Sequence, residues 1–124
     1  AKILQMHQNN GTYGREDYFE PTTVLKFTTE KSSLSRRGLG FDKPDPERPQ
    51  NSPTCEEAPA SVYGHTGYTG TAFWVDPDND IIYIFLSNRV YPHRWNTSLF
   101  DTNIRTRIQS VIYQSLQPDS LSVE

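Results

Sequence analysis

The apolar run IIYIFL at residues 81–86 constrains the fold more than any other feature of the sequence. Alternating apolar and polar residues predict a strand with one solvent-exposed face, whereas a continuous apolar run is typical of a strand covered on both faces. The turn-forming sequence DPDND lies just before it, at residues 76–80, and residues 63–75 read as another strand. We therefore expect an antiparallel pair of strands with helices on both faces, which is an α+β fold.

Two helices are expected before these strands. The sequence AKILQMHQNNG at residues 1–11 reads as the interior of a helix, in which Ile3, Leu4 and His7 follow helical spacing and Asn10 and Gly11 provide a C-terminal stop signal. Residues 20–31 form the second helix, with Pro21 suited to its first turn. Its expected apolar face is formed by Val24, Leu25 and Phe27.

A last helix is predicted over about residues 101–116, closed by Pro118. One apolar stripe is expected to join the core, formed by Ile104, Ile108, Val111, Ile112 and Leu116. Between the other elements, residues 11–19 have hairpin or loop character and residues 36–42 are compatible with a short strand. The proline-rich residues 43–59 form either a surface loop or a flap that borders a site.

The composition limits the classes of function. A chain of 124 residues is one domain at most. Hydrophobic residues make up 34% of it, which is little for a self-sufficient core, although 12% aromatic residues partly offset this. The net charge of −3, with both signs mixed, argues against a nucleic-acid or anionic-membrane partner. No apolar run approaches the length of a membrane span, which is about 20 residues.

The sequence GHTGYTG at residues 64–70 gives up side-chain packing within a strand. Glycine in a strand marks a bulge or a place where something approaches the backbone closely. Two interpretations stay open from the residues alone. In one, a ligand lies along the strand beside His65, which can change charge near pH 7, and Thr66, whose hydroxyl donates and accepts hydrogen bonds. In the other, the segment is a twisted hairpin and His65 is a solvated surface residue.

His65-Thr66-Gly67, followed by YTGTAFWVDP and DNDIIYIFLSNRV, resembles the third motif of the serine β-lactamase and penicillin-binding-protein superfamily. Many members have Lys-Thr-Gly, and His-Thr-Gly is the variant of a branch related to class C β-lactamases that contains esterases and peptidases. The order of GTYGREDYFEPTTVLKFT, RRGLGFDKP and SNRVYP is also similar, so the resemblance covers residues 1–116. It implies an antiparallel sheet flanked by helices, as in the C-terminal part of a β-lactamase-like (transpeptidase) fold.

The resemblance also implies a site. The motif strand would form one wall of an active site, beside a helix that carries a nucleophilic serine. His65 would replace the family lysine and hold a substrate carboxylate together with Thr66, while Gly67 keeps this wall thin. The backbone N–H of Tyr68 would be one of two donors to the oxyanion. No cofactor or metal is implied, the substrate would be a small-molecule or peptidoglycan-like acyl compound, and the location would be periplasmic or extracellular.

Two further family motifs are absent from the sequence. None of the four lysines has a serine three residues before it, so there is no Ser-x-x-Lys, and no Tyr-x-Asn or Ser-x-Asn occurs. We therefore expect residues 1–124 to be the C-terminal part of one domain and inactive alone, with the N-terminal remainder of the protein as partner. An exposed sheet edge would favour self-association of an isolated fragment. The alternative is a non-catalytic binding module derived from the same fold.

A metal site is the weakest candidate, because its ligands lack zinc-type spacing. It would use His7, His65 and His93 with Asp76 or Asp80.

Four other residues have expected roles outside this motif. Cys55 has no partner for an internal disulfide and is interpreted as a bystander thiol. Tyr91 and Trp95 would form either an aromatic lip for substrate or, more simply, side chains tucked onto the sheet. Arg89 is interpreted as a structural residue that pairs with a carboxylate.

Overall fold

The computed structural model describes residues 1–29 and 32–116. The N-terminal part contains α1 (Lys2–Gln8), β1 (Thr12–Tyr13), β2 (Glu16–Asp17) and α2 (Pro21–Thr28). A long irregular segment with one short helix, η1 (Pro49–Asn51), leads to β3 (Tyr63–Thr66), β4 (Ala72–Asp76) and β5 (Ile81–Phe85). Then α3 (Ser98–Asp101) and α4 (Ile104–Leu116) follow. The protein is therefore an α+β protein, as predicted.

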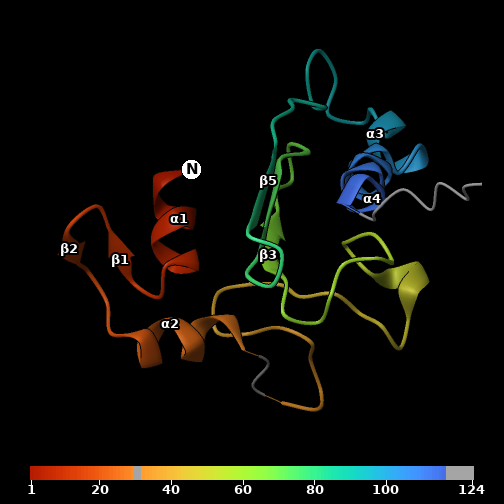
Figure 1. Cartoon of the computed structure of the whole chain (residues 1–124). Coiled ribbons are helices and arrows are strands. Elements are labelled where there is room, and N and C mark those ends of the chain that lie inside the picture. Colours follow the sequence, from red (N-terminus) through yellow and green to blue (C-terminus); the bar gives the residue numbers. More distant parts are fainter. Residues whose placement is uncertain (30–31, 117–124) are drawn as a thin grey trace, which may run out of the picture.

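The strands β3, β4 and β5 form an antiparallel sheet in that order, so β3 and β5 are its edges. The register places His65 opposite Phe73, which in turn lies opposite Ile84. Figure 1 shows α1 on one side of this sheet and α4 on the other. The expected arrangement, with helices on both faces of the sheet, is confirmed.

Each face of the sheet has its own apolar cluster. On the side of α1, the buried residues are Leu4, Tyr63 and Val75, with Phe41, Phe73 and Ile82 packed against them. On the side of α4, they are Val62, Trp74 and Tyr83, with Ala58, Ile81, Phe85 and Ile112 packed against them. Successive residues of a strand face opposite sides, so β4 contributes Trp74 to one cluster and Val75 to the other. This explains why the strand sequences are apolar at consecutive positions.

Two strand predictions need correction. Residues 63–75 do not form one strand, because β3 ends at Thr66 and the chain reverses before β4. Residues 36–42 do not form a strand either; only Asp42 pairs, in an isolated bridge with Gly64. Of the two readings of residues 11–19, the hairpin is the one observed, since β1 pairs with β2.

The first helix runs from Lys2 to Gln8, and the positive φ angles of Asn10 (54°) and Gly11 (104°) just after it match the expected stop. The second helix begins at Pro21, in its predicted range, but ends at Thr28, because Thr29 is already extended. Its predicted apolar face is wrong, because Val24 is buried whereas Leu25 is 64% exposed and Phe27 is 44% exposed.

The last helix begins at Ile104, after the separate α3, and its predicted apolar stripe is mostly wrong. Ile112 packs on the core, but Val111 is 64% exposed and Leu116 is 49% exposed. The buried residues of α4 are Gln109 and Tyr113. Both can be buried because the Gln109 side chain accepts the Cys55 N–H and the Tyr113 hydroxyl donates to Asp76. Pro118 lies outside the described residues. Among the helices of the described ranges, none combines the length and apolarity needed to cross a membrane.

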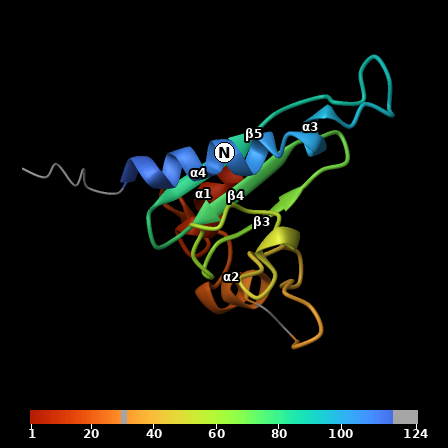
Figure 2. The ribbon, with the colours of Figure 1, turned by 90° about the vertical axis from the view of Figure 1, so that its right-hand side faces the viewer.

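The buried Asp76 carboxylate joins the sheet to α4, which lies across the strands in Figure 2. Its Oδ1 atom accepts the N–H groups of Asp78 and Asn79, which closes the turn between β4 and β5. Its Oδ2 atom accepts the hydroxyl of Tyr113 at 2.6 Å. Burial, together with this carboxylate, raises the pKa of Tyr113 above its ordinary value, so the hydroxyl remains a donor at neutral pH. The stabilisation is therefore complete below about pH 10 and is lost only as the pH rises through the raised pKa.

We expect Tyr113→Phe to lower the free energy of unfolding by about 1–2 kcal/mol, because it removes a donor from a buried carboxylate that keeps its other hydrogen bonds. Urea denaturation of the protein measures this change. Tyr91→Phe is the matched control, since Tyr91 is 77% exposed, and it should change stability by less than about 0.5 kcal/mol. Equal effects of the two substitutions would contradict the role of the Tyr113 hydroxyl.

Candidate functional site

The outer edge of β3 is the centre of the candidate site. The N–H of Asp42 donates to the Gly64 carbonyl at 2.7 Å, and the N–H of Gly64 donates back at 3.0 Å. Peptide groups alternate in direction along a strand, so those of Thr66 also point outward, away from β4. Within the described ranges, no strand pairs with β3 on this side beyond Asp42. The edge at Thr66 can therefore accept an extended chain as an added strand.

A tight loop at residues 68–70 connects β3 to β4. The N–H of Gly70 donates to the Gly67 carbonyl at 3.0 Å, the N–H of Gly67 donates to the Thr71 carbonyl at 2.7 Å, and Gly70 has φ 97°. This is a turn closed by a glycine bulge, a common three-residue hairpin connection.

The loop fixes the direction of the Tyr68 N–H. In a trans peptide the C=O and N–H point in opposite directions. Because the Gly67 carbonyl points into the turn, toward the Gly70 N–H, the Tyr68 N–H points out of it. No acceptor for this N–H lies among the described residues. A fixed, unpaired backbone donor of this kind is the group that an oxyanion requires.

The His65 side chain lies on the α1 face of the sheet, next to an open cleft of about 600 Å³. Its Nδ1 atom is 2.8 Å from the Thr66 carbonyl oxygen. Because a carbonyl can only accept, Nδ1 carries the hydrogen and Nε2 remains for another partner. The cleft is lined by Ala1, Ile3, Leu4, Gly40, Phe41, His65, Thr66, Gly67, Thr71, Ala72, Phe73, Ile84 and Leu86. Three of the four residues expected at the site thus border one mostly apolar cavity, with the loop that carries Tyr68 beside it.

Close neighbours within the protein explain why this segment contains glycines, and the sequence did not reveal these neighbours. A Cβ atom at Gly64 would collide with the Phe73 carbonyl oxygen and would come within 2.6 Å of the Trp74 ring. At Gly70 a Cβ would meet Ser87 and Leu99, besides the positive φ. At Gly67 it would meet the Thr71 hydroxyl, the end of a side chain rather than backbone. Packing against backbone therefore requires Gly64 and the positive φ favours Gly70, whatever a ligand requires.

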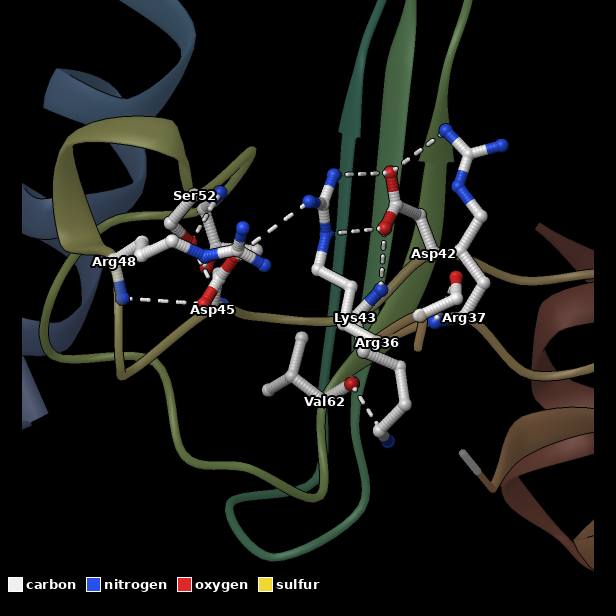
Figure 3. Close-up of polar contacts among 10 residues, drawn as sticks. Arg36, Arg37, Asp42, Lys43, Asp45, Arg48, Ser52 and Val62 are labelled. Atoms are coloured by element: carbon white, nitrogen blue, oxygen red, sulfur yellow. Dashed lines mark hydrogen bonds and ion pairs between the residues drawn. The ribbon is translucent and has the colours of Figure 1, made fainter. Parts of the chain in front are cut away.

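An ionic network holds the segment before β3 against the sheet edge (Figure 3). The buried Asp42 carboxylate accepts two hydrogen bonds from Arg36, at 2.7 and 3.0 Å, and one from Arg37 at 3.2 Å. Nearby, Asp45 lies 3.7 Å from Arg36 and 3.2 Å from Arg48. Bidentate pairing fixes the geometry of a carboxylate as well as its charge. Asp42, the residue that pairs with Gly64, is thereby fixed beside β3.

The residues weighed for a metal site do not come together. His7 packs against Phe41, with ring centroids 5.3 Å apart, whereas His93 stacks on Trp95 at 4.9 Å. Asp76 is committed to Tyr113, and Asp80 accepts a hydrogen bond from Gln8. The described part of the chain contains no group of three or more His, Cys, Asp or Glu side chains arranged to hold a metal ion.

Two further sequence interpretations change. Trp95 and Tyr91 are 73% and 77% exposed and so are not tucked onto the sheet, and neither lines the cleft. Among the described residues, Arg89 pairs with no carboxylate; it donates to backbone carbonyls, including that of Tyr68 at 2.9 Å. The sequence singled out Arg89 but could not predict these partners, because backbone acceptors leave no trace in a sequence.

Cys55 is buried. Burial, reinforced by the neighbouring Glu57 carboxylate, raises the pKa of its thiol to about 12. The thiol is therefore protonated at neutral pH and a poor nucleophile, which supports the bystander interpretation.

Known proteins match most of this chain. The Beta-lactamase family matches residues 3–102. A protein of Escherichia coli (strain K12) named "Putative D-alanyl-D-alanine carboxypeptidase" is 35% identical over 98 residues, which is 75% of this chain and 21% of that protein. A protein of the same name from Salmonella newport (strain SL254) is 35% identical over 94 residues, again 75% of this chain and 21% of its own length.

The chain thus spans about a fifth of the length of these relatives. The match includes the β3 segment with His65-Thr66-Gly67, and the resemblance drawn from that motif is confirmed. The chain belongs to the Beta-lactamase family.

Proposed function

We propose that these residues form the third-motif wall of the cleft of an acyl-transferring serine hydrolase. One observation carries the proposal: His65, Thr66 and Gly67 border an open cleft at an unpaired strand edge, in a chain that belongs to the Beta-lactamase family. In this proposal residues 1–124 are the C-terminal part of a single domain.

The proposed reaction begins when a serine oxygen adds to a substrate carbonyl carbon and loses its proton to a neighbouring base. The C=O π electrons move to oxygen, and the resulting oxyanion is stabilised by the N–H of Tyr68. Collapse expels the protonated leaving group and gives an acyl-enzyme, which water hydrolyses to the free acid and the regenerated serine. Removal of one such donor costs about 10²–10³ in kcat.

The serine and its base have to come from other residues, since the sequence contains no Ser-x-x-Lys and no Tyr-x-Asn. The N-terminal remainder of the same protein would supply them. The 124 residues alone would then be inactive, because they hold the wall and one oxyanion donor but no activated nucleophile.

A substrate with a free carboxylate fits this wall best. The His65 side chain is exposed at the cleft that Thr66 also lines, and a cationic imidazole there can hold a carboxylate. The relatives named as carboxypeptidases support peptides ending in D-alanyl-D-alanine, which have such a group. Cell-wall peptides lie outside the cytoplasm, so the proposal includes a periplasmic or extracellular location.

The natural full-length polypeptide should react covalently with a biotinylated fluorophosphonate, which labels activated serines, whereas the 124-residue chain alone should not. Labelling is measured by mass spectrometry, and the modified peptide should contain Ser-x-x-Lys. Thr66→Val should raise KM for an acyl-D-alanyl-D-alanine substrate, while Thr69→Val, in the exposed loop of the same hairpin, should not. Substrate binding without any covalent adduct or turnover would instead favour the non-catalytic binding module.

His65→Gln should raise KM for an acyl-D-alanyl-D-alanine substrate about two- to fivefold, because the neutral glutamine amide offers no cation to the carboxylate. Steady-state kinetics measure this change. His65→Lys keeps a cationic side chain at this position, so its KM should stay close to the wild-type value. A neutral ester without the carboxylate is the control, and His65→Gln should leave its KM unchanged. An equal rise of KM for both substrates would contradict this role of His65.

A further inference from the structure

The segment after β5 packs on the hairpin loop through one arginine. The backbone N–H of Arg89 donates to the Thr69 carbonyl at 2.9 Å, and its Nε donates to the Tyr68 carbonyl, also at 2.9 Å. Its Nη1 donates in the other direction, to the carbonyls of Arg94 and Asn96, both at 3.0 Å. Arg89 therefore ties the loop that follows the motif to the segment that follows β5.

The guanidinium of Arg89 is also held by two rings. Its Cζ atom lies 4.6 Å from the centroid of Tyr68 and 4.6 Å from that of Phe100. Such cation–π contacts add to the hydrogen bonds and restrict the side chain to one position. A planar guanidinium can donate in several directions while its faces contact rings, which an ammonium cannot do.

A second arginine extends the same arrangement. Nη1 of Arg105, on α4, lies 3.3 Å from the Gly70 carbonyl and 3.4 Å from the Thr71 carbonyl. Four successive carbonyls, Tyr68 to Thr71, thus accept hydrogen bonds from Arg89 or Arg105. Among the described residues, neither arginine forms a salt bridge. The two arginines therefore clamp the loop mainly through guanidinium groups that donate to backbone carbonyls.

The turn and the clamp together hold the peptide groups on both sides of the Tyr68 Cα atom. The preceding peptide, which carries the Tyr68 N–H, is held by the bond between Gly67 and Gly70. The following peptide, which carries the Tyr68 carbonyl, is held by Nε of Arg89. With both peptides fixed, the φ and ψ angles of Tyr68 are fixed, and so is the direction of its N–H.

We propose that Arg89 is a positioning residue for the Tyr68 N–H as an oxyanion donor, with Arg105 completing the clamp. The inference rests on the proposed function, since an oxyanion forms only if acyl transfer occurs. Arg89 does not contact the substrate in this account. Its effect passes through the backbone of Tyr68, and a misplacement of about 1 Å at such a donor can cost about 10²-fold in rate.

The test compares an ester substrate with its thionoester in the natural full-length polypeptide. Sulfur is a weak hydrogen-bond acceptor, so a well-placed N–H favours the ester over the thionoester. We expect Arg89→Gln to lower kcat for the ester by about 10- to 100-fold, with KM changed less than about threefold. The ratio of ester to thionoester rates should fall by a similar factor.

Arg107→Gln is the matched control, because Arg107 lies on α4 like Arg105 and its side chain is exposed. It should leave both rates and their ratio unchanged. Arg89→Lys keeps the charge but loses the planar guanidinium with its several donors, so it should also lose most of the ester rate. It serves as the second variant if Arg89→Gln does not fold.

Equal losses for the ester and the thionoester, or full activity in Arg89→Lys, would overturn the positioning role while leaving the proposed function intact. A wild-type polypeptide that turns over neither substrate and forms no acyl-enzyme would overturn the proposed function, and the inference with it. The two failures are therefore distinguishable by the wild-type rate alone.

Discussion

The pairing register of β3 with β4 is the constraint on which the rest of this structure depends. A slip of one residue would turn every β3 side chain to the opposite face. Gly64 opposes this slip, because any side chain there would collide with the Phe73 backbone and the Trp74 ring. The Asp42 bridge on the outer side, held by Arg36 and Arg37, fixes the same residue from the other direction.

From that register the geometry of the candidate site follows in steps. His65 comes to lie on the α1 face beside the cleft, and the peptide groups of Thr66 point to the open edge. The chain then reverses in three residues, which turns the Tyr68 N–H outward. Arg89 links this loop to the segment after β5, so residues far apart in the sequence hold the loop that carries this backbone donor. The site is therefore mostly backbone geometry, with few side chains.

The sequence predicted the elements that depend on a local residue pattern. It did not predict which residues are buried, because burial depends on contacts with distant parts of the chain. Consecutive apolar residues in β5 predicted a sheet covered on both faces, and the turn residues before it predicted the reversal. Periodicity could not predict which apolar residues of α2 and α4 are buried. Leu25 and Val111 are exposed, whereas Gln109 is buried because its side chain accepts the Cys55 N–H. A buried polar residue of this kind cannot be distinguished from a surface one in a single sequence.

The sequence also predicted a part of the candidate site. The motif located His65, Thr66 and Gly67, and the structure brings them to one cleft, but the role of Tyr68 and the substrate remain proposals. The most direct test is the crystal structure of the natural full-length polypeptide with a phosphonate bound to its serine. A phosphonyl oxygen should lie about 2.7–3.1 Å from the Tyr68 backbone nitrogen, with the adduct along the β3 edge. An adduct whose oxygen is bound by other donors, away from residues 65–68, would contradict it.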